Sequence, residues 1–223
     1  MSGSVRIKIC GVTTPEDARL AVEAGADLLG LNFVPGSPRR LEIAQAIEIA
    51  DSVAGEIERV ALFRDEDPLE IERILRRVEV ERVQLHGDET PEEVEAMDMP
   101  VIKALRGADV EAAERYPGAI LLLDHPTAGG GRGQSWPWSD AMPLLADGYD
   151  VILAGGLSPD NVGQALAELG DLLPWGVDVA TGVEGEGYRK EPEKIAAFIR
   201  AVRTAEDVGR ESEDEDGEGE GAS

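Results

Sequence analysis

Eight short aliphatic segments alternate with stretches of helical spacing, and this alternation constrains the fold of the chain more than any other feature. We expect strands at Val5–Cys10, Leu28–Phe33, Glu58–Phe63, Arg82–His86, Val101–Leu105, Ala119–Asp124, Val151–Ala154 and Gly176–Ala180. Because strands that alternate with helices form parallel sheets, eight such units without a linker-like break predict one α/β domain over residues 1–205, a parallel (β/α)8 TIM barrel. An open, doubly wound sheet is the alternative, since the helical patterns after the fifth strand are weak.

Helical patterns follow most of these strands. Apolar residues recur at helical spacing in Pro15–Ala24, and again after the last strand in Glu191–Thr204. Three helix starts share one chemistry: Thr14-Pro15-Glu16-Asp17, Thr90-Pro91-Glu92-Glu93 and Ser158-Pro159-Asp160-Asn161. A hydroxyl cap followed by proline in the first turn is typical of a helix N-terminus, so we expect helices to begin just after the strands end.

The charge balance excludes two classes of partner. The 223 residues hold 46 acidic and 21 basic side chains, a net charge of −25, which repels nucleic acids and anionic membrane surfaces. The chain shows neither a membrane-spanning apolar run nor a secretory signal pattern, so we expect a cytoplasmic protein. Lysine is scarce and arginine supplies most cations. This composition suggests a halophile, and the alternative is an acidic surface that gives solubility in ordinary salt.

The last 18 residues, 206–223, contain nine acidic residues and one basic residue. Without them the chain still has a net charge of −17, so the acidity is not confined to its end. Segments of high charge density without apolar periodicity remain disordered. We therefore expect residues 206–223 to form a disordered acidic tail, either solvated without a partner or serving as a docking element.

One cysteine and two histidines limit the chemistry that the chain can perform. A single cysteine excludes an internal disulfide and any cysteine-rich metal site, and two histidines are too few for most histidine-based zinc sites. We therefore expect no metal site, and chemistry carried by carboxylates, one thiol and main-chain groups.

Alternation within the strands places polar side chains at one end of the expected barrel. In the first strand, Ile7 and Ile9 alternate with polar residues, so the apolar pair faces the outer helices and the polar set faces the lumen. By the same count, four polar side chains meet at the C-terminal mouth, where active sites of this fold lie: Cys10, His86, Asp124 and Asp178. Taken singly, each has a structural alternative, such as a core thiol, a helix cap or a histidine bonded to a carbonyl.

Glycine-rich turns follow the strands whose loops bind phosphate in this fold. Backbone N–H groups in the loops after the seventh and eighth strands form an anion site, and a third glycine cluster after the sixth strand lies where it can close over that site. The candidate phosphate-binding residues are Gly131, Gly133, Gly155, Gly156, Thr181 and Gly182. We expect a sugar-phosphate ligand, with simple tight turns as the structural alternative.

Seven motifs occur in order along nearly the whole chain before the tail. They are Lys8-Ile9-Cys10-Gly11-Val12-Thr13, Gly36-Ser37-Pro38-Arg39, Val83-Gln84-Leu85-His86-Gly87, Leu122-Leu123-Asp124, Gly130-Gly131-Arg132-Gly133, the segment from Leu153 to Val162, and Val177-Asp178-Val179 to Gly182-Val183-Glu184. Together they resemble the phosphoribosylanthranilate isomerase family of tryptophan biosynthesis. The resemblance implies a cofactor-free Amadori rearrangement, in which N-(5-phosphoribosyl)anthranilate becomes 1-(2-carboxyphenylamino)-1-deoxyribulose 5-phosphate.

The resemblance also implies an acid and a base. Asp124 matches the acid that protonates the ribose ring oxygen, and Cys10 matches the base that removes a proton from C2′. The charge of Lys8, on the same strand face as Cys10, is expected to favour the thiolate. An apolar setting is expected to keep Asp124 protonated.

The remaining roles implied by the resemblance concern substrate binding. Arg39 resembles the residue that binds the anthranilate carboxylate, because a planar guanidinium fits a carboxylate through two hydrogen bonds, and adjacent Arg40 is the alternative. Lys8, His86 and Asp178 are expected to contact and position the substrate. A small sugar phosphate is the partner implied, and the oligomeric state, monomer or homodimer, stays open.

Two segments depart from the family pattern. Ala180-Thr181-Gly182 stands where the family often has two serines, and Trp136-Pro137-Trp138 replaces a Phe-Asp-Trp-like segment. Two other functions remain open at this point. One is a related isomerase of histidine biosynthesis, or one acting on both substrates, which generally has an aspartate where this chain has Cys10. The other is a sugar-phosphate-binding barrel without catalysis.

Overall fold

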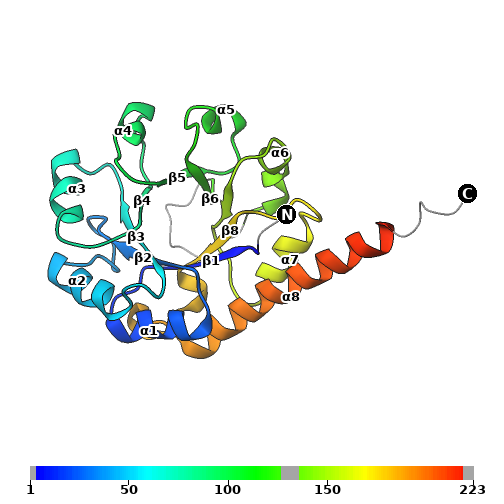
Figure 1. Cartoon of the computed structure of the whole chain (residues 1–223), viewed down its shortest axis with the longest axis horizontal. Coiled ribbons are helices and arrows are strands. Elements are labelled where there is room, and N and C mark those ends of the chain that lie inside the picture. Colours follow the sequence, from blue (N-terminus) through cyan, green and yellow to red (C-terminus); the bar gives the residue numbers. More distant parts are fainter. Residues whose placement is uncertain (1–3, 127–135, 218–223) are drawn as a thin grey trace, which may run out of the picture.

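The chain folds into a closed barrel of eight parallel strands (Figure 1). The computed structural model describes residues 4–126 and 136–217, with residues 208–217 described by their backbone alone. The strands are β1 (Arg6–Cys10), β2 (Leu28–Asn32), β3 (Glu58–Phe63), β4 (Arg82–Leu85), β5 (Val101–Arg106), β6 (Ile120–Asp124), β7 (Val151–Leu153) and β8 (Gly176–Val179). Because β1 pairs with β8 as well as β2, the sheet closes, so the predicted barrel is confirmed and the open sheet is wrong.

A ring of helices surrounds the barrel (Figure 1). They are α1 (Pro15–Ala24), α2 (Ile43–Ser52), α3 (Pro68–Leu75), α4 (Pro91–Glu95), α5 (Val110–Ala113), α6 (Met142–Ala146), α7 (Val162–Ala167) and α8 (Pro192–Gly217). The weak helical patterns after the fifth strand correspond to short helices, since α5 has 4 residues and α6 has 5. No helix in residues 4–126 or 136–217 is long and apolar enough to cross a membrane.

Two apolar layers hold the barrel together. The outer layer lies between strands and helices and includes Ile7 and Ile9 of β1, both fully buried. The inner layer fills the lumen with Leu28, Val60, Ile102, Ala104, Ile120, Leu122, Ile152 and Ala154. The predicted outward and inward faces of β1 are confirmed, but the lumen is polar only in part, because β2, β3, β5, β6 and β7 all send apolar side chains inward.

Two of the three predicted helix starts have the expected hydroxyl cap. Thr14 accepts a hydrogen bond from the backbone N–H of Asp17, and Thr90 forms a capping box with Glu93. The third expectation is wrong, because α7 begins only at Val162 and Ser158 lies in the preceding loop. There the Asn161 side chain accepts from the backbone N–H of Ser158 and donates to a glycine carbonyl, and so ties the loop to itself.

The C-terminal segment corrects the expected boundary at residue 206. Helix α8 continues to Gly217 and projects beyond the ring of helices (Figure 1). Glu206 is buried, accepts a hydrogen bond from the backbone N–H of Val5 and pairs with Arg203. Glutamate favours helix, and extending an already packed helix avoids the cost of nucleation, so the acidic composition does not end the helix. The expected disorder of residues 218–223 lies outside the described residues.

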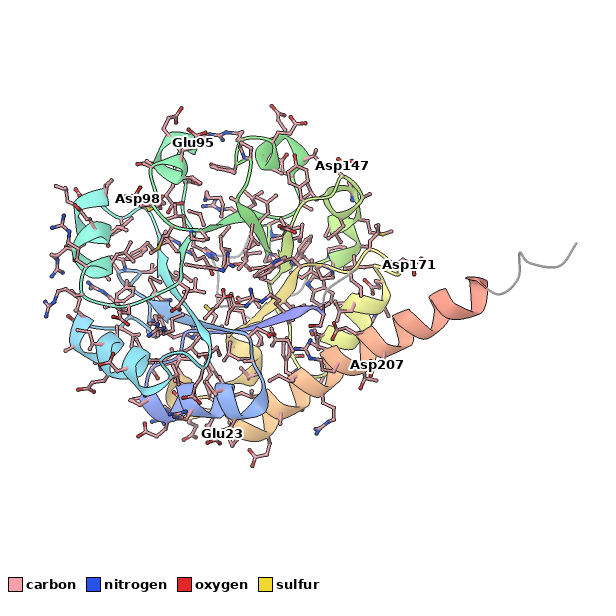
Figure 2. The ribbon with its side chains drawn as sticks, in the orientation of Figure 1. Glu23, Glu95, Asp98, Asp147, Asp171 and Asp207 are labelled. Carbon is pink, nitrogen blue, oxygen red and sulfur yellow. The ribbon has the colours of Figure 1, made fainter. Side chains whose placement is uncertain are left out.

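Acidic side chains point outward around the whole barrel (Figure 2). Those of Glu23, Glu95, Asp98, Asp147 and Asp171 project from its rim. Three of the four lysines, by contrast, are buried, since Lys8, Lys103 and Lys190 are 1%, 1% and 4% exposed. The few ammonium groups of this chain are therefore used mainly inside ion pairs, and its surface is dominated by carboxylates.

This surface leads to a prediction about salt. Raising the salt concentration from about 0.01 M to about 1 M shortens the screening length from about 30 Å to about 3 Å, which removes most repulsion between surface carboxylates. We expect the melting temperature to rise by several degrees with potassium chloride over this range. Thermal melts at stepped salt concentrations measure the effect, and a flat melting temperature would contradict it.

The matched control for this experiment is the chain ending at Asp207, which keeps the buried Glu206. It holds 39 acidic and 20 basic residues, a net charge of −19. Because α8 projects away from the barrel beyond this point, we expect the truncated chain to show nearly the same salt dependence. A dependence abolished by the truncation would place the repulsion in the C-terminal segment instead of on the barrel surface.

Candidate active site

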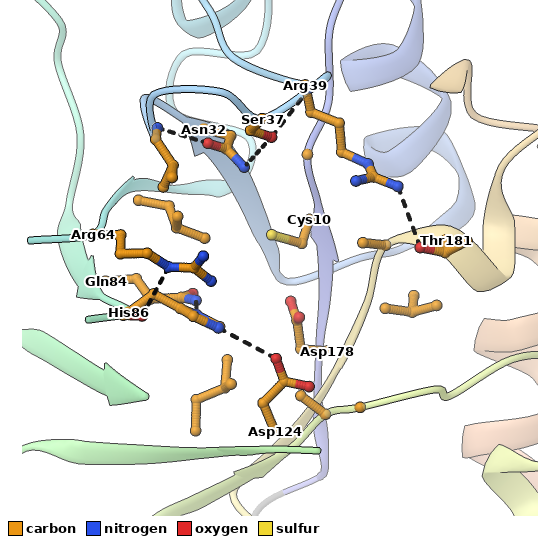
Figure 3. Close-up of a pocket in the computed structure, with 18 of the residues that line it drawn as sticks. Cys10, Asn32, Ser37, Arg39, Arg64, Gln84, His86, Asp124, Asp178 and Thr181 are labelled. Atoms are coloured by element: carbon orange, nitrogen blue, oxygen red, sulfur yellow. Dashed lines mark hydrogen bonds and ion pairs between the residues drawn. The ribbon is translucent and has the colours of Figure 1, made fainter. Parts of the chain in front are cut away.

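A cavity of about 470 Å³ opens at the carboxyl ends of the strands. Four of the side chains that line it are Cys10, His86, Asp124 and Asp178 (Figure 3). The structure therefore brings together the polar groups that strand parity assigns to one mouth. They come from the ends of β1, β4, β6 and β8, so residues distant in sequence share the same wall.

Asp124 ends a chain of hydrogen bonds that crosses the cavity. The Nε2 atom of His86 lies 3.2 Å from Oδ2 of Asp124, and Nδ1 of His86 lies 2.9 Å from Nε2 of Gln84 (Figure 3). An ionised carboxylate can only accept, so Nε2 of His86 donates to Asp124. Gln84 lies two residues before His86 on the inward face of the same strand and is 1% exposed, and the sequence analysis assigned it no role.

The protonation of Asp124 differs from expectation. Burial raises the pKa of this carboxyl, but the hydrogen bond and charge of His86, together with the backbone N–H of His125, outweigh burial and hold the pKa below its ordinary value. The expectation that an apolar setting keeps Asp124 protonated is therefore wrong for this structure. Polar partners across the barrel decide the protonation state, and the apolar neighbours do not.

Cys10 differs from expectation in a similar way. The residue is 7% exposed, and burial raises the pKa of its thiol. Lys8 and Lys190 lower that pKa and Asp178 raises it, and the net result lies above the ordinary cysteine value. Lys8 thus acts in the expected direction, but burial of the thiol outweighs it, and Asp178, whose Oδ1 lies 2.7 Å from Nζ of Lys8, opposes it.

The titration of Cys10 can be measured directly, because it is the only cysteine in the chain. We expect iodoacetamide to alkylate it at a rate that rises with pH, with a midpoint above the value of about 8.5 for a free thiol. Asp178→Asn removes a negative charge and frees the charge of Lys8, so the midpoint moves to lower pH. A midpoint below about 8.5 in the unaltered chain, or an upward shift in the variant, would contradict this account.

Arg39 is buried beside the cavity and is held in a fixed orientation. Its Nε and Nη2 donate to the two carboxylate oxygens of Glu184 at 2.7 and 2.6 Å, and Nη2 lies 3.2 Å from the hydroxyl of Thr181. Gly11 makes room for Arg39, since a Cβ there would lie 2.4 Å from its Cδ. Adjacent Arg40 is exposed and does not line the cavity, so of the two arginines Arg39 is the one that faces it.

Two residues that sequence reasoning missed hold this corner together. Glu184 is 8% exposed and pairs with both Arg39 and Lys190. Nζ of Lys190 donates to the carbonyl of Cys10 at 2.6 Å and to Glu184 at 2.8 Å, so it joins the end of β1 to the loop after β8. The scarcity of lysine in the sequence could have pointed to Lys190. Because arginine supplies most of the cations of this chain, a lysine close to glycine-rich turns is a candidate for a specific ion pair.

The loops after β7 and β8 form a glycine-lined wall of the same cavity. Gly155, Gly156, Thr181 and Gly182 all line it. A Cβ at Gly155 would lie 3.0 Å from Oδ1 of Asp124, and its φ is +78°, so both space and backbone conformation require glycine there. At Gly182 a Cβ would lie 2.2 Å from the carbonyl oxygen of Leu157, which shows that the two loops touch.

Gly131 and Gly133, the expected third phosphate-binding cluster, lie outside the described residues. Within residues 4–126 and 136–207, no group of three or more His, Cys, Asp or Glu side chains is arranged to hold a metal ion. One oxygen on the cavity wall, Oε1 of Gln84, is buried without a hydrogen-bond partner.

The closed barrel of eight parallel strands, with a polar cavity at its C-terminal mouth, places this chain among the (β/α)8-barrel proteins. Residues 7–201 match the family described as N-(5′-phosphoribosyl)anthranilate (PRA) isomerase. The chain is 45% identical over 204 residues to the isomerase of that name from Neisseria gonorrhoeae. The match covers 87% of this chain and 95% of the relative. It is 46% identical over 209 residues to the isomerase of Pseudomonas putida, and that match covers 91% of this chain and 99% of the relative. This chain belongs to the PRA isomerase family.

Solved structures agree with this assignment. Phosphoribosyl anthranilate isomerase from Thermus thermophilus superposes with a TM-score of 0.81 at 39% identity and covers 90% of this chain and 99% of its own. Another phosphoribosyl anthranilate isomerase, solved in complex with reduced 1-(o-carboxyphenylamino)-1-deoxyribulose 5-phosphate, superposes with a TM-score of 0.79 at 34% identity and the same coverage. The predicted fold and family are confirmed.

Proposed function

We propose that this chain converts N-(5′-phosphoribosyl)anthranilate to 1-(2-carboxyphenylamino)-1-deoxyribulose 5-phosphate, with Asp124 as the acid and Cys10 as the base. The observation that carries the proposal is that one cavity is lined by this carboxyl, this thiol and Arg39. An aldosylamine-to-ketose rearrangement needs one proton delivered and one removed, so an acid and a base suffice.

In the first step Asp124 gives its proton to the ribose ring oxygen. The bond from C1′ to that oxygen breaks, and the nitrogen lone pair forms an iminium. The low pKa of Asp124 leaves few protonated molecules at neutral pH, but the substrate changes the balance. Its carboxylate and phosphate bring negative charge into a cavity from which water is expelled, and both effects raise the pKa of a nearby carboxyl.

In the second step the thiolate of Cys10 removes the proton on C2′. The electrons of the C–H bond form the enolamine and neutralise the iminium, and tautomerisation then yields the ketone at C2′ with a proton added at C1′. The developing iminium is positively charged, which favours the thiolate of Cys10 at the moment when it is needed. Lys8 and Lys190 supply further positive charge near the thiol.

The two ends of the substrate fit different walls of the cavity. The anthranilate carboxylate binds the guanidinium of Arg39, whose Nη1 is turned away from Glu184. The phosphate binds the backbone N–H groups of the loops after β7 and β8, in the position usual for this fold. His86 and Asp178 face the sugar between these two ends.

Location and salt adaptation belong to the same proposal. A phosphorylated, charged substrate does not cross membranes, so we place the protein in the cytoplasm. The dense carboxylate surface suits a cytoplasm rich in salt, and the salt-dependent melts described above test that inference.

A growth experiment tests the function in a cell. A tryptophan auxotroph that lacks this isomerase step should grow without tryptophan when it expresses this chain, in medium that permits its folding. The same strain expressing Cys10→Ala at equal protein level is the matched control and should not grow. Failure of the unaltered, folded chain to restore growth would contradict the proposed function.

A further inference from the structure

Tyr188 lies at the tip of a small hairpin beside the cavity. The hairpin is closed by an antiparallel bridge between Glu184 and Lys190, and by a 2.9 Å hydrogen bond from the N–H of Gly185 to the carbonyl of Arg189. Both bridge residues are buried and ion-paired to each other. The base of this hairpin is therefore fixed, and its tip is held over the mouth of the barrel.

The backbone of Tyr188 has a conformation that does not suit its side chain. Its φ is +64°, and among the described residues only one other non-glycine residue, Asp65, has a positive φ. Bulky residues rarely adopt this region, and such strain persists where the surrounding structure imposes it, often at functional sites. Tyr188 is also 43% exposed, so burial does not account for an aromatic ring there.

The ring of Tyr188 packs against the guanidinium of Arg39, the group proposed above to bind the substrate carboxylate. The guanidinium carbon of Arg39 lies 5.0 Å from the centroid of the ring, within the range of a cation–π contact. Tyr188 also lines the cavity that contains Cys10. Tyr188 therefore combines a strained backbone with an exposed ring, and it lies where the buried Arg39 faces the cavity.

We propose that Tyr188 forms the outer wall of the subsite for the anthranilate ring and stacks against that ring in the bound substrate. The inference rests on the proposed function. In anthranilate the carboxylate is bonded directly to the ring, so a carboxylate fixed on Arg39 brings the ring next to Tyr188. Offset or edge-to-face contact between two aromatic rings is favourable beyond the area that it buries. Tyr188 would thereby select an aromatic amine over an aliphatic one.

Two substitutions separate the ring from the shape of the loop. Tyr188→Asn removes the ring but introduces a residue that tolerates positive φ, so the hairpin keeps its conformation. Tyr188→Phe keeps the ring. We expect the Asn variant to raise KM about fivefold while kcat stays within about twofold. The Phe variant should match the unaltered chain.

Binding measurements with two probes complete the test. The reduced ketose product analogue carries the aromatic ring, and ribulose 5-phosphate lacks it. In Tyr188→Asn, we expect Kd to rise about fivefold for the analogue and to stay unchanged for ribulose 5-phosphate. Equal weakening of both probes, or no weakening of either, would overturn the inference. Absence of isomerase activity in the unaltered chain would instead overturn the proposed function.

Discussion

Replacing either member of the acid–base pair should lower turnover by at least about a hundredfold, the usual effect of losing a positioned proton-transfer group. Cys10→Ala removes the thiol that takes the proton from C2′. Asp124→Asn removes the proton donor for the ring oxygen. Steady-state kinetics on the purified variants measure both effects, and near-normal turnover in either variant would contradict the role assigned to that residue.

The fold should survive both substitutions. Alanine at position 10 loses one sulfur atom that packs beside Gly30. Asparagine at position 124 keeps an oxygen that can accept from His86 or from the backbone N–H of His125, the two groups that Asp124 contacts. Melting temperatures within a few degrees of the unaltered chain are therefore the control that separates lost chemistry from lost structure.

Replacing Arg39 should give the second large effect, on binding. A hydrogen bond to a charged group contributes about 1.5–3 kcal/mol, which corresponds to an increase of about 10- to 100-fold in the Kd of a carboxylate-bearing ligand. We expect Arg39→Ala to weaken binding of the reduced product analogue by this factor. Glu184 keeps Lys190 as a partner in the variant, so it is not left as an unpaired buried charge.

The neighbouring arginine provides the matched control. Arg40 is exposed and does not line the cavity, so Arg40→Ala should change Kd by less than about twofold. Arg39→Lys should recover only part of the affinity, because an ammonium lacks the planar two-donor geometry. If Arg40 were the sensitive residue, the carboxylate site would be displaced by one position from the place that we assign to it.

The sequence was sufficient to predict the barrel and the mouth at which the candidate side chains meet. The alternation in β1 sets the outward face of Ile7 and Ile9, and closure of the sheet then directs Cys10 and Asp124 toward one mouth. These inferences need only periodicity and the geometry of the fold. Each of the eight expected strands corresponds to a strand in the structure, to within one or two residues at its ends.

The protonation states could not be predicted in the same way. They depend on partners that only the fold brings together. The carboxyl of Asp124 meets His86, 38 positions away, and Arg39 meets Glu184, 145 positions away. A lysine near Cys10 suggested a thiolate, but burial of the thiol, together with Asp178 on the adjacent strand, holds the pKa of Cys10 above its ordinary value.

The errors at the helix ends have a different cause. Ser158-Pro159 has the composition of a helix start, yet the Asn161 side chain captures the loop through its own hydrogen bonds, and α7 begins later. In α8 the acidic composition suggested disorder from Glu206, but the tertiary contact of that carboxylate with the backbone N–H of Val5, 201 positions away, continues the packed helix. Local composition cannot show such contacts.

The most direct test of the central claim is to mix N-(5′-phosphoribosyl)anthranilate with the purified chain and follow the fluorescence of the anthranilate group. We predict rapid consumption of the substrate, with the ketose product identified by chromatography. The double variant Cys10→Ala, Asp124→Asn should show only the rate seen in buffer. A folded, unaltered chain that consumes the substrate no faster than buffer does, or no faster than the double variant, would contradict the account.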